Sequence, residues 1–144
     1  MNISEIKQMV SKDITLNETQ LDIESLKTPQ IHNKYLVILM EEKLILEKMY
    51  SELKIMKRDK WLYYTGKMGE DDLKKHDWEP FPLTILKTDI DKFLQSDSDV
   101  HRIEAKIILQ KEKVNYLEEV IKIVSNRQWN IRAALDWIKF TQGQ

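Results

Sequence analysis

Residues 97 to 126 read DSDVHRIEAKIILQKEKVNYLEEVIKIVSN, a stretch that contains neither glycine nor proline. From Val100 to Val124 one helical face recurs at alternating steps of three and four, apolar at every position except Gln110, which is the seam spacing of helices that pack along one another. The same spacing continues to Ile138, with a break at Ser125-Asn126, two residue types that prefer helix caps to helix interiors. The C-terminal third therefore predicts two successive amphipathic helices.

The apolar face of these two helices is broader than one partner helix covers, because Trp129, Trp137 and Phe140 add large rings beside the seam. We expect the face to join copies of the chain. The alternative is an intramolecular bundle in which the seam packs on the chain's own long helix. The residues expected at the oligomer interface are Ile107, Val114, Leu117, Ile121, Val124, Ile131, Leu135 and Ile138.

The N-terminal half has the same helical character. Residues 2 to 11 form a short amphipathic pattern, and Asn17 has the spacing to Gln20 of a capping box that starts a second helix. This second helix is expected to run to about residue 63 with a kink at Pro29. Its seam consists of Tyr35, Leu39, Glu42, Leu46, Met49, Leu53, Met56, Lys60 and Tyr63.

The helical period is lost between residues 65 and 88, where two glycines, an acidic run and Trp78-Glu79-Pro80-Phe81-Pro82 occur. We expect a long loop whose apolar residues pack back on the helices, and then a short helix from Asp89 to Gln95. Asp97 or Ser98 can cap the helix that follows.

These patterns predict an all-α fold made of a long amphipathic helix and a C-terminal helical hairpin or bundle, with a long central loop, in a chain that oligomerises. We expect one helical domain over 1–144. Its parts are N-terminal helices (1–64), a loop with a short helix (65–96) and oligomerisation helices (97–144).

Composition limits the classes of function. Among 144 residues, 33% are charged, only three are glycine and three proline, and none is cysteine, so disulfides, thiolate metal sites and cysteine nucleophiles are excluded. No apolar run reaches the length of about 20 residues that a bilayer span needs. With a net charge of -1, any nucleic-acid binding must depend on a local patch.

Motifs for catalysis or cofactor binding are not apparent. The three histidines lie far apart, phosphate-binding glycine motifs are missing, and no metal-ligand spacing occurs. We therefore expect neither enzyme activity, nor a cofactor, nor a metal. The weak alternative is an acid-base pair formed by Asp72 and His76.

One stretch carries binding chemistry. Residues 54 to 67, KIMKRDKWLYYTGK, combine five cations and three aromatics with a single acid. Cations can neutralise phosphates while aromatic rings stack on unpaired bases, so this pattern suits single-stranded DNA of any sequence. The alternative is that the rings are core anchors and the lysines only solvate the helix end. The candidate DNA-binding residues are Lys54, Lys57, Arg58, Lys60, Trp61, Tyr64 and Lys67.

The cluster Lys57-Arg58-Asp59-Lys60, followed by Leu62-Tyr63-Tyr64-Thr65-Gly66, resembles the UvsY family of recombination mediators of T-even phages. The segment from Val124 through Ile131 to Gly143 is also similar, and chain length and element order agree over nearly the whole chain. Asp59 departs from the family pattern, because the family tolerates a small apolar residue between its two basic residues.

The resemblance implies a ring-like homo-oligomer of about six or seven copies in the cytoplasm of the infected bacterial host. Its implied partners are single-stranded DNA, a UvsX-like recombinase of the RecA type, and the phage single-strand-binding protein that this recombinase must displace. The family's basic pair for DNA falls on Arg58 and Lys60. The alternative function is a helical scaffold or adaptor that binds protein partners without DNA.

Overall fold

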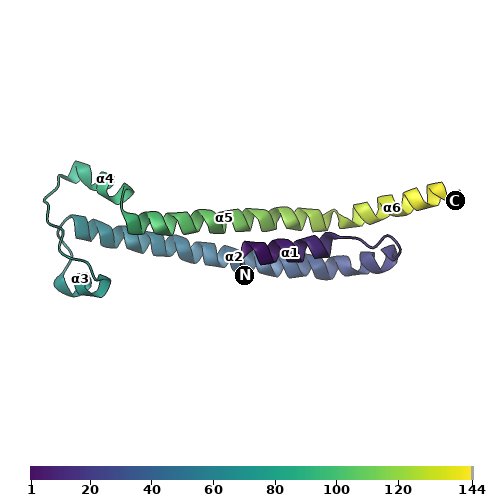
Figure 1. The fold of residues 1–144 in the computed structure, drawn as a ribbon, viewed down its shortest axis with the longest axis horizontal. Coiled ribbons are helices and arrows are strands. Elements are labelled where there is room, and N and C mark those ends of the chain that lie inside the picture. The colour runs from purple at the N-terminus through teal and green to yellow at the C-terminus, as the bar shows by residue number, and fades with distance from the viewer. Residues whose placement is uncertain (144) are drawn as a thin grey trace. The chain divides into compact units, whose positions relative to one another are not determined.

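The computed structural model describes residues 1–143, and over this range every regular element is helical and none is a strand. The predicted all-α class is confirmed. The elements are α1 (Ile3–Ile14), α2 (Leu21–Tyr64), α3 (Glu70–His76), the 3-10 turn η1 (Lys87–Asp89), α4 (Ile90–Gln95), α5 (Ser98–Ser125) and α6 (Arg127–Thr141), as labelled in Figure 1.

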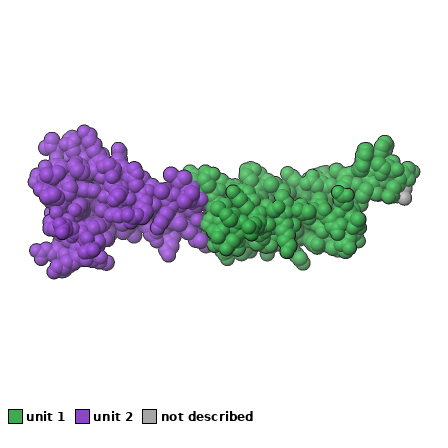
Figure 2. All heavy atoms as spheres, viewed as in Figure 1, with its two compact units in different colours: residues 1–43, 111–144 green, residues 44–110 purple. Residues whose placement is uncertain are grey.

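The chain forms two compact units, which Figure 2 shows in different colours. Unit 1 comprises Met1–Lys43 and Lys111–Gln144, and unit 2 comprises Leu44–Gln110. Both α2 and α5 contribute to both units. Unit 1 therefore combines two segments that are far apart in the sequence, whereas unit 2 is one continuous stretch.

In unit 1, α1 packs on the N-terminal half of α2. The α1 residues Ile6 and Val10 are buried, and Asp13 at its end accepts hydrogen bonds of 2.7 Å from both Lys34 and Tyr35. The N-terminus of α1 is held by a capping box between Asn2 and Glu5. The predicted helix at residues 2 to 11 is therefore present, and it extends to Ile14.

The start of α2 differs from the prediction. Asn17 is not its N-cap, because the helix begins only at Leu21. Instead, the Asn17 carboxamide oxygen accepts hydrogen bonds from the backbone and hydroxyl of Thr19, and the Asn17 carbonyl accepts one from the backbone of Gln20. The polar side chain thus organises a turn before the helix, which is the other common use of asparagine.

Pro29 lies inside α2, and the helix continues through this residue. Because proline lacks an N–H, the carbonyl of Ser25 loses its donor within the helix. The side-chain amide of Gln128, at the start of α6, donates to that carbonyl at 3.4 Å, and the Ser25 hydroxyl donates to the Gln128 side chain at 3.1 Å. Contacts from α6 therefore satisfy a backbone group that the proline exposes.

A buried ion pair lies beside Pro29. Arg127 is 3% exposed, and its guanidinium donates to the Glu24 carboxylate, to the Glu24 carbonyl and, at 2.8 Å, to the Thr28 hydroxyl. A hydrogen bond from Lys27 and the nearby charges lower the pKa of Glu24 despite its burial. Arg127 thereby attaches the first residue of α6 to the first turns of α2.

The predicted oligomer-interface residues fall into two groups. Ile121 and Ile138 are half-buried and Leu135 is exposed. The remaining five are buried within the chain's own units, as the intramolecular alternative describes: Ile107, Val114, Leu117, Val124 and Ile131.

The helices α5 and α6 are separated only at Asn126, where the sequence predicted a break. After this break α6 continues in the direction of α5 and does not fold back along it (Figure 1). Of the two predicted arrangements, the hairpin is therefore not formed. The C-terminal half of α5 instead packs on α2, with Lys113 ion-paired to the buried Glu42 at 3.4 Å.

In unit 2, the segment predicted as one long loop contains the helix α3. Its first turn is Glu70-Asp71-Asp72 and its last is Lys74-Lys75-His76, a charge order that matches the helix dipole. No residue of α3 is buried. Its sequence therefore lacks the regular apolar spacing from which a helix can be predicted. The predicted short helix at Asp89 to Gln95 is confirmed as the end of η1 and α4.

No helix in the described part of the chain is long and apolar enough to cross a membrane.

Candidate nucleic-acid interface

The last three turns of α2 in unit 2 expose one cationic face. Lys54, Lys57, Arg58 and Trp61 share it through helical spacings of three and four. The side chains of Lys57 and Arg58 are 51% and 67% exposed, and the Trp61 residue is 39% exposed. Their cations and ring are thus available to a ligand in solution.

The two central cations of this face have weak internal partners. Lys57 lies 3.7 Å from Glu104, and Arg58 is paired at 3.1 Å with its neighbour Asp59. In both pairs the cation is exposed, and pairs at a protein surface contribute at most about 1 kcal/mol, so a phosphate can compete for these cations. Lys54 has no ion pair among the described residues, and its side chain is exposed.

Lys60 lies in a different environment. The residue is only 6% exposed, and its ammonium is 3.2 Å from Asp97 and 2.8 Å from Asp99. The same ammonium lies 3.9 Å from the centre of the Trp78 ring and 5.6 Å from that of Tyr63. Two carboxylates and two aromatic rings thus enclose the ammonium, which leaves it little access to a DNA phosphate.

Asp97 connects this cation to the start of α5. Its carboxylate accepts a 2.6 Å hydrogen bond from the Tyr64 hydroxyl and caps α5 through the backbone N–H groups of Asp99 and Val100. Of the two predicted caps, the structure uses Asp97. Burial alone would raise the pKa of Asp97, but the hydrogen bonds from Tyr64, Val100 and Lys60 lower it below its usual value.

Tyr64 belongs to the same internal network. Burial and the hydrogen bond to the Asp97 carboxylate raise the pKa of the Tyr64 hydroxyl. Its ring packs against Phe81 and Phe93, with centroid distances of 5.0 and 5.5 Å. The hydroxyl is therefore engaged internally, while the ring contributes to the wall of a pocket that is described below.

The central loop returns to α2 through aromatic contacts, as the sequence predicted for Trp78 and Phe81. Trp78 and Phe81 lie 5.4 and 5.6 Å from Tyr63 between ring centres. The expectation does not hold for Leu83 and Leu86, which are 59% and 72% exposed.

His76 is paired with Asp59 and not with the predicted Asp72. Its Nε2 lies 3.3 Å from the Asp59 carboxylate, and its ring stacks on Trp78 at 4.1 Å. Asp59, which also pairs with Arg58, thus links the cationic face to α3. Within residues 1–143 no three His, Cys, Asp or Glu side chains cluster closely enough to hold a metal ion.

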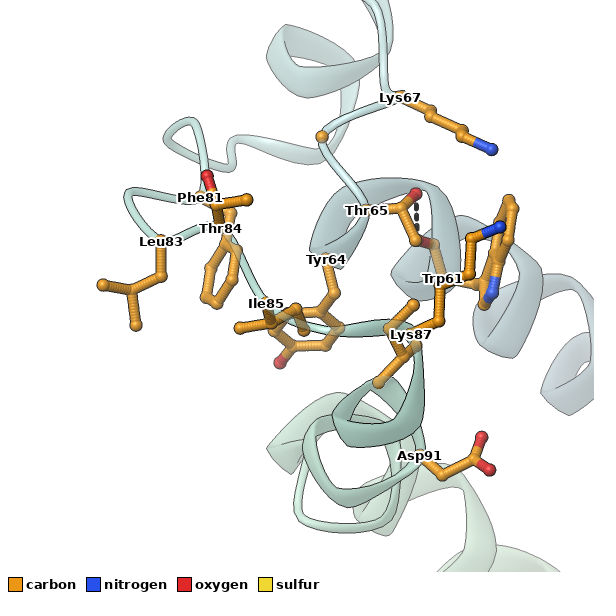
Figure 3. Close-up of a pocket in the computed structure, with 12 residues that line it drawn as sticks. Trp61, Tyr64, Thr65, Lys67, Phe81, Leu83, Thr84, Ile85, Lys87 and Asp91 are labelled. Atoms are coloured by element: carbon orange, nitrogen blue, oxygen red, sulfur yellow. Dashed lines mark hydrogen bonds between the residues drawn. The ribbon is translucent and has the colours of Figure 1, made fainter.

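A pocket of about 530 Å³ opens beside the cationic face, within unit 2. Trp61 and Lys67 contribute to one part of its lining, and the Lys67 ammonium lies 4.8 Å from the centre of the Trp61 ring. Figure 3 shows Trp61 between Lys67 and Asp91 in that view. The complete lining is Trp61, Tyr64, Thr65, Gly66, Lys67, Phe81, Leu83, Thr84, Ile85, Lys87, Ile90 and Asp91.

Of the charged residues in this lining, Lys87 and Asp91 were not among the predicted site residues. They follow the central loop by sequence and belong to η1 and α4. No basic or aromatic cluster surrounds them in the sequence, and only the return of the loop to α2 brings them near Trp61.

Comparison with known families decides the classification. Residues 9–144 match the model of the family described as "Recombination, repair and ssDNA binding protein UvsY". The chain belongs to the UvsY family. The resemblance in the cluster from Lys57 to Gly66 is thereby confirmed at the level of the whole chain.

Solved structures agree with this UvsY assignment. Crystal structures of the bacteriophage T4 recombination mediator protein UvsY in lattice types II, IV and I match with TM-scores of 0.82, 0.83 and 0.81. In the same order, the sequence identities are 18%, 16% and 17%. The alignments cover 99%, 97% and 95% of this chain, and 98%, 99% and 98% of the T4 chains. They show that the fold is shared. Comparison with curated protein sequences gave no match.

In this UvsY-family chain, Lys60 is expected to act mainly on stability. Replacing it in Lys60→Met leaves Asp97 and Asp99 close together without their shared cation, which typically costs about 3 to 5 kcal/mol for a buried pair. Urea denaturation followed by circular dichroism measures the loss. The exposed Lys57→Met is the matched control and should change the free energy of unfolding by less than about 1 kcal/mol. Equal stability of the two variants would show that the Lys60 ammonium is not held internally.

Proposed function

We propose that this chain is a recombination mediator that binds single-stranded DNA as a homo-oligomer. It would promote loading of a RecA-type recombinase onto a strand covered by single-strand-binding protein. The observation that carries the proposal is the exposed cationic and aromatic face of α2 in a member of the UvsY family.

The proposed DNA-contacting residues are those of the predicted set whose charge or ring faces solvent. They are Lys54, Lys57, Arg58, Trp61 and Lys67. The cations would bind phosphates, and Trp61 would stack on a base without regard to its identity. Lys60 and the Tyr64 hydroxyl would instead hold the end of α2 in place.

Each protomer presents only a few cations, and the net charge of the whole chain is -1. A single patch is therefore expected to bind weakly at physiological salt. Several patches in one oligomer raise the effective concentration of the site around a strand that is already bound. Self-association and DNA binding thus support one another in this proposal.

Loading of the recombinase follows from linked equilibria. A mediator that binds the strand in the geometry preferred by the recombinase lowers the affinity of the competing single-strand-binding protein. This requires differential binding to two states of the strand and no covalent chemistry by the mediator.

The first prediction from this proposed function concerns the cationic face. The double variant Lys57→Ala/Arg58→Ala should bind a single-stranded oligonucleotide more weakly, and the salt slope of log K should decrease by about 1.4 because each phosphate contact contributes about 0.7. Fluorescence anisotropy at several salt concentrations measures both quantities.

The matched control is Lys7→Ala/Lys122→Ala, which removes two exposed positive charges from unit 1. It should keep the parent slope, because only the local patch is proposed to contact the strand. Equal slopes for the two double variants would exclude the assigned face. No binding of the parent chain at about 50 mM salt, where phosphate contacts are strongest, would favour a scaffold that binds only proteins.

A second prediction concerns recombinase loading. On a strand already coated with single-strand-binding protein, the parent chain should shorten the lag in the DNA-dependent ATPase of a RecA-type recombinase, and Lys57→Ala/Arg58→Ala should not. On bare strand, where no competitor has to be displaced, neither should change the lag. A parent chain that binds DNA but leaves the lag on coated strand unchanged would exclude the mediator role while leaving DNA binding intact.

A third prediction concerns assembly through α6, where Trp129, Trp137 and Phe140 are 70%, 66% and 74% exposed. We propose that this face joins copies of the chain, because apolar surface of this extent is unusual on a monomer. Leu135→Asp should lower the mass measured by light scattering, since a carboxylate cannot be buried there without a partner. Leu86→Asp, at an exposed leucine of unit 2, is the control and should keep the parent mass. If both variants keep it, α6 is not the interface.

A further inference from the structure

We propose that the pocket beside Trp61 takes one unpaired nucleobase of the bound strand and prefers bases that carry an exocyclic amino group. This inference rests on the proposed function, because it names what one part of the DNA-binding surface recognises. It assigns roles to two residues outside the basic cluster, Lys87 and Asp91.

The size and the walls of the pocket suit a base. Its volume of about 530 Å³ lies within the range of about 300 to 1,000 Å³ that is usual for small-ligand sites. Trp61, Tyr64 and Phe81 contribute rings to its lining, and Ile85 and Ile90 add aliphatic surface. A planar heterocycle can be desolvated there against apolar groups and can stack on the exposed ring of Trp61.

The cations are placed for the backbone on either side of that base. Lys67 and Lys87 both line the pocket, and both residues are exposed. The ammonium of Lys67 lies over the Trp61 ring at 4.8 Å, a contact worth little at an exposed site. An arriving base can therefore replace Lys67 on the ring, while the flexible ammonium moves to a phosphate.

Asp91 gives the pocket its selectivity. It is the one carboxylate in the lining, it is exposed, and no ion pair or hydrogen bond engages its side chain among the described residues. A carboxylate repels phosphate and accepts hydrogen bonds only. A strand would therefore place a base, and not its backbone, beside Asp91.

The four bases differ in what they can donate to this carboxylate. Adenine and cytosine each carry an amino group, and guanine adds a ring N–H beside its own. Thymine has a single ring N–H that lies between two carbonyl oxygens, which a carboxylate repels. The pocket should consequently discriminate against thymine.

The test compares strands of equal length by fluorescence anisotropy: oligo(dC), oligo(dA), oligo(dT) and an abasic strand with the same number of phosphates. The parent chain should bind oligo(dC) and oligo(dA) about 2- to 12-fold more tightly than oligo(dT), as one hydrogen bond provides, and the abasic strand most weakly. Trp61→Ala should weaken binding to the three base-bearing strands and leave the abasic strand and the salt slope unchanged.

Asp91→Asn tests the selectivity directly, because an amide of the same shape can donate to a thymine carbonyl. It should reduce or reverse the discrimination against oligo(dT). Asp89→Asn makes the same change of charge two residues away, outside the pocket lining, and should retain the parent preference. Circular dichroism melting curves check that each variant is folded.

The outcomes separate this proposal from the proposed function. If every strand binds with the parent salt slope, and neither base identity nor Trp61→Ala affects affinity, the strand is held by its phosphates alone and the pocket takes no base. If a difference between oligo(dC) and oligo(dT) persists unchanged in Asp91→Asn, the selectivity is not due to Asp91. If no strand binds at low salt, the DNA-binding function itself is excluded.

Discussion

The buried ammonium of Lys60 is the contact on which the architecture of unit 2 depends. Its two carboxylate partners, Asp97 and Asp99, lie 37 and 39 residues later in the chain, at the start of α5. Because a buried charge without a partner is strongly unfavourable, the end of α2 and the start of α5 must meet at this point. The same pairing lets Asp97 cap α5 and lets Trp78 cover the ammonium. The segment between α2 and α5 is thereby held at both of its ends.

Unit 1 contains a second internal pair of the same kind. Arg127 reaches the carboxylate and backbone of Glu24, which attaches the start of α6 to α2 next to Pro29. Within each unit, a long side chain from one helix meets an acid that is distant in sequence. Apolar seams allow neighbouring helices to slide past each other by a turn, whereas a buried ion pair is satisfied in one register only. We infer that these pairs fix the register of helices whose apolar faces are otherwise regular.

The sequence predicted most of what depends on neighbouring residues, with the cap at Asn17 as an exception, and missed what depends on distant ones. Helical spacing and cap chemistry predicted the all-α class, the break at Ser125-Asn126 and a cap at Asp97 or Ser98. The motif around Arg58 predicted the family. Helical spacing also predicted that Lys60 lies on the seam of the long helix α2. The position of Lys60 in a basic cluster nevertheless suggested a DNA contact. Its acidic partners are visible only in the folded chain. The exposed helix α3 was missed because it has no apolar face.

Burial divides the predicted DNA-binding residues into two groups. Arg58 and Lys60 are two residues apart and were predicted as one basic pair, but about 100° of helical rotation per residue places them on different faces of α2. Arg58 is free to exchange Asp59 for a phosphate, while Lys60 is enclosed by its carboxylates. If the exposed cations bind DNA, as proposed, the buried Lys60 holds the end of α2 in place and the exposed side chains present the positive charge. The pocket beside Trp61 then lies where a strand that follows these cations would meet the returning loop.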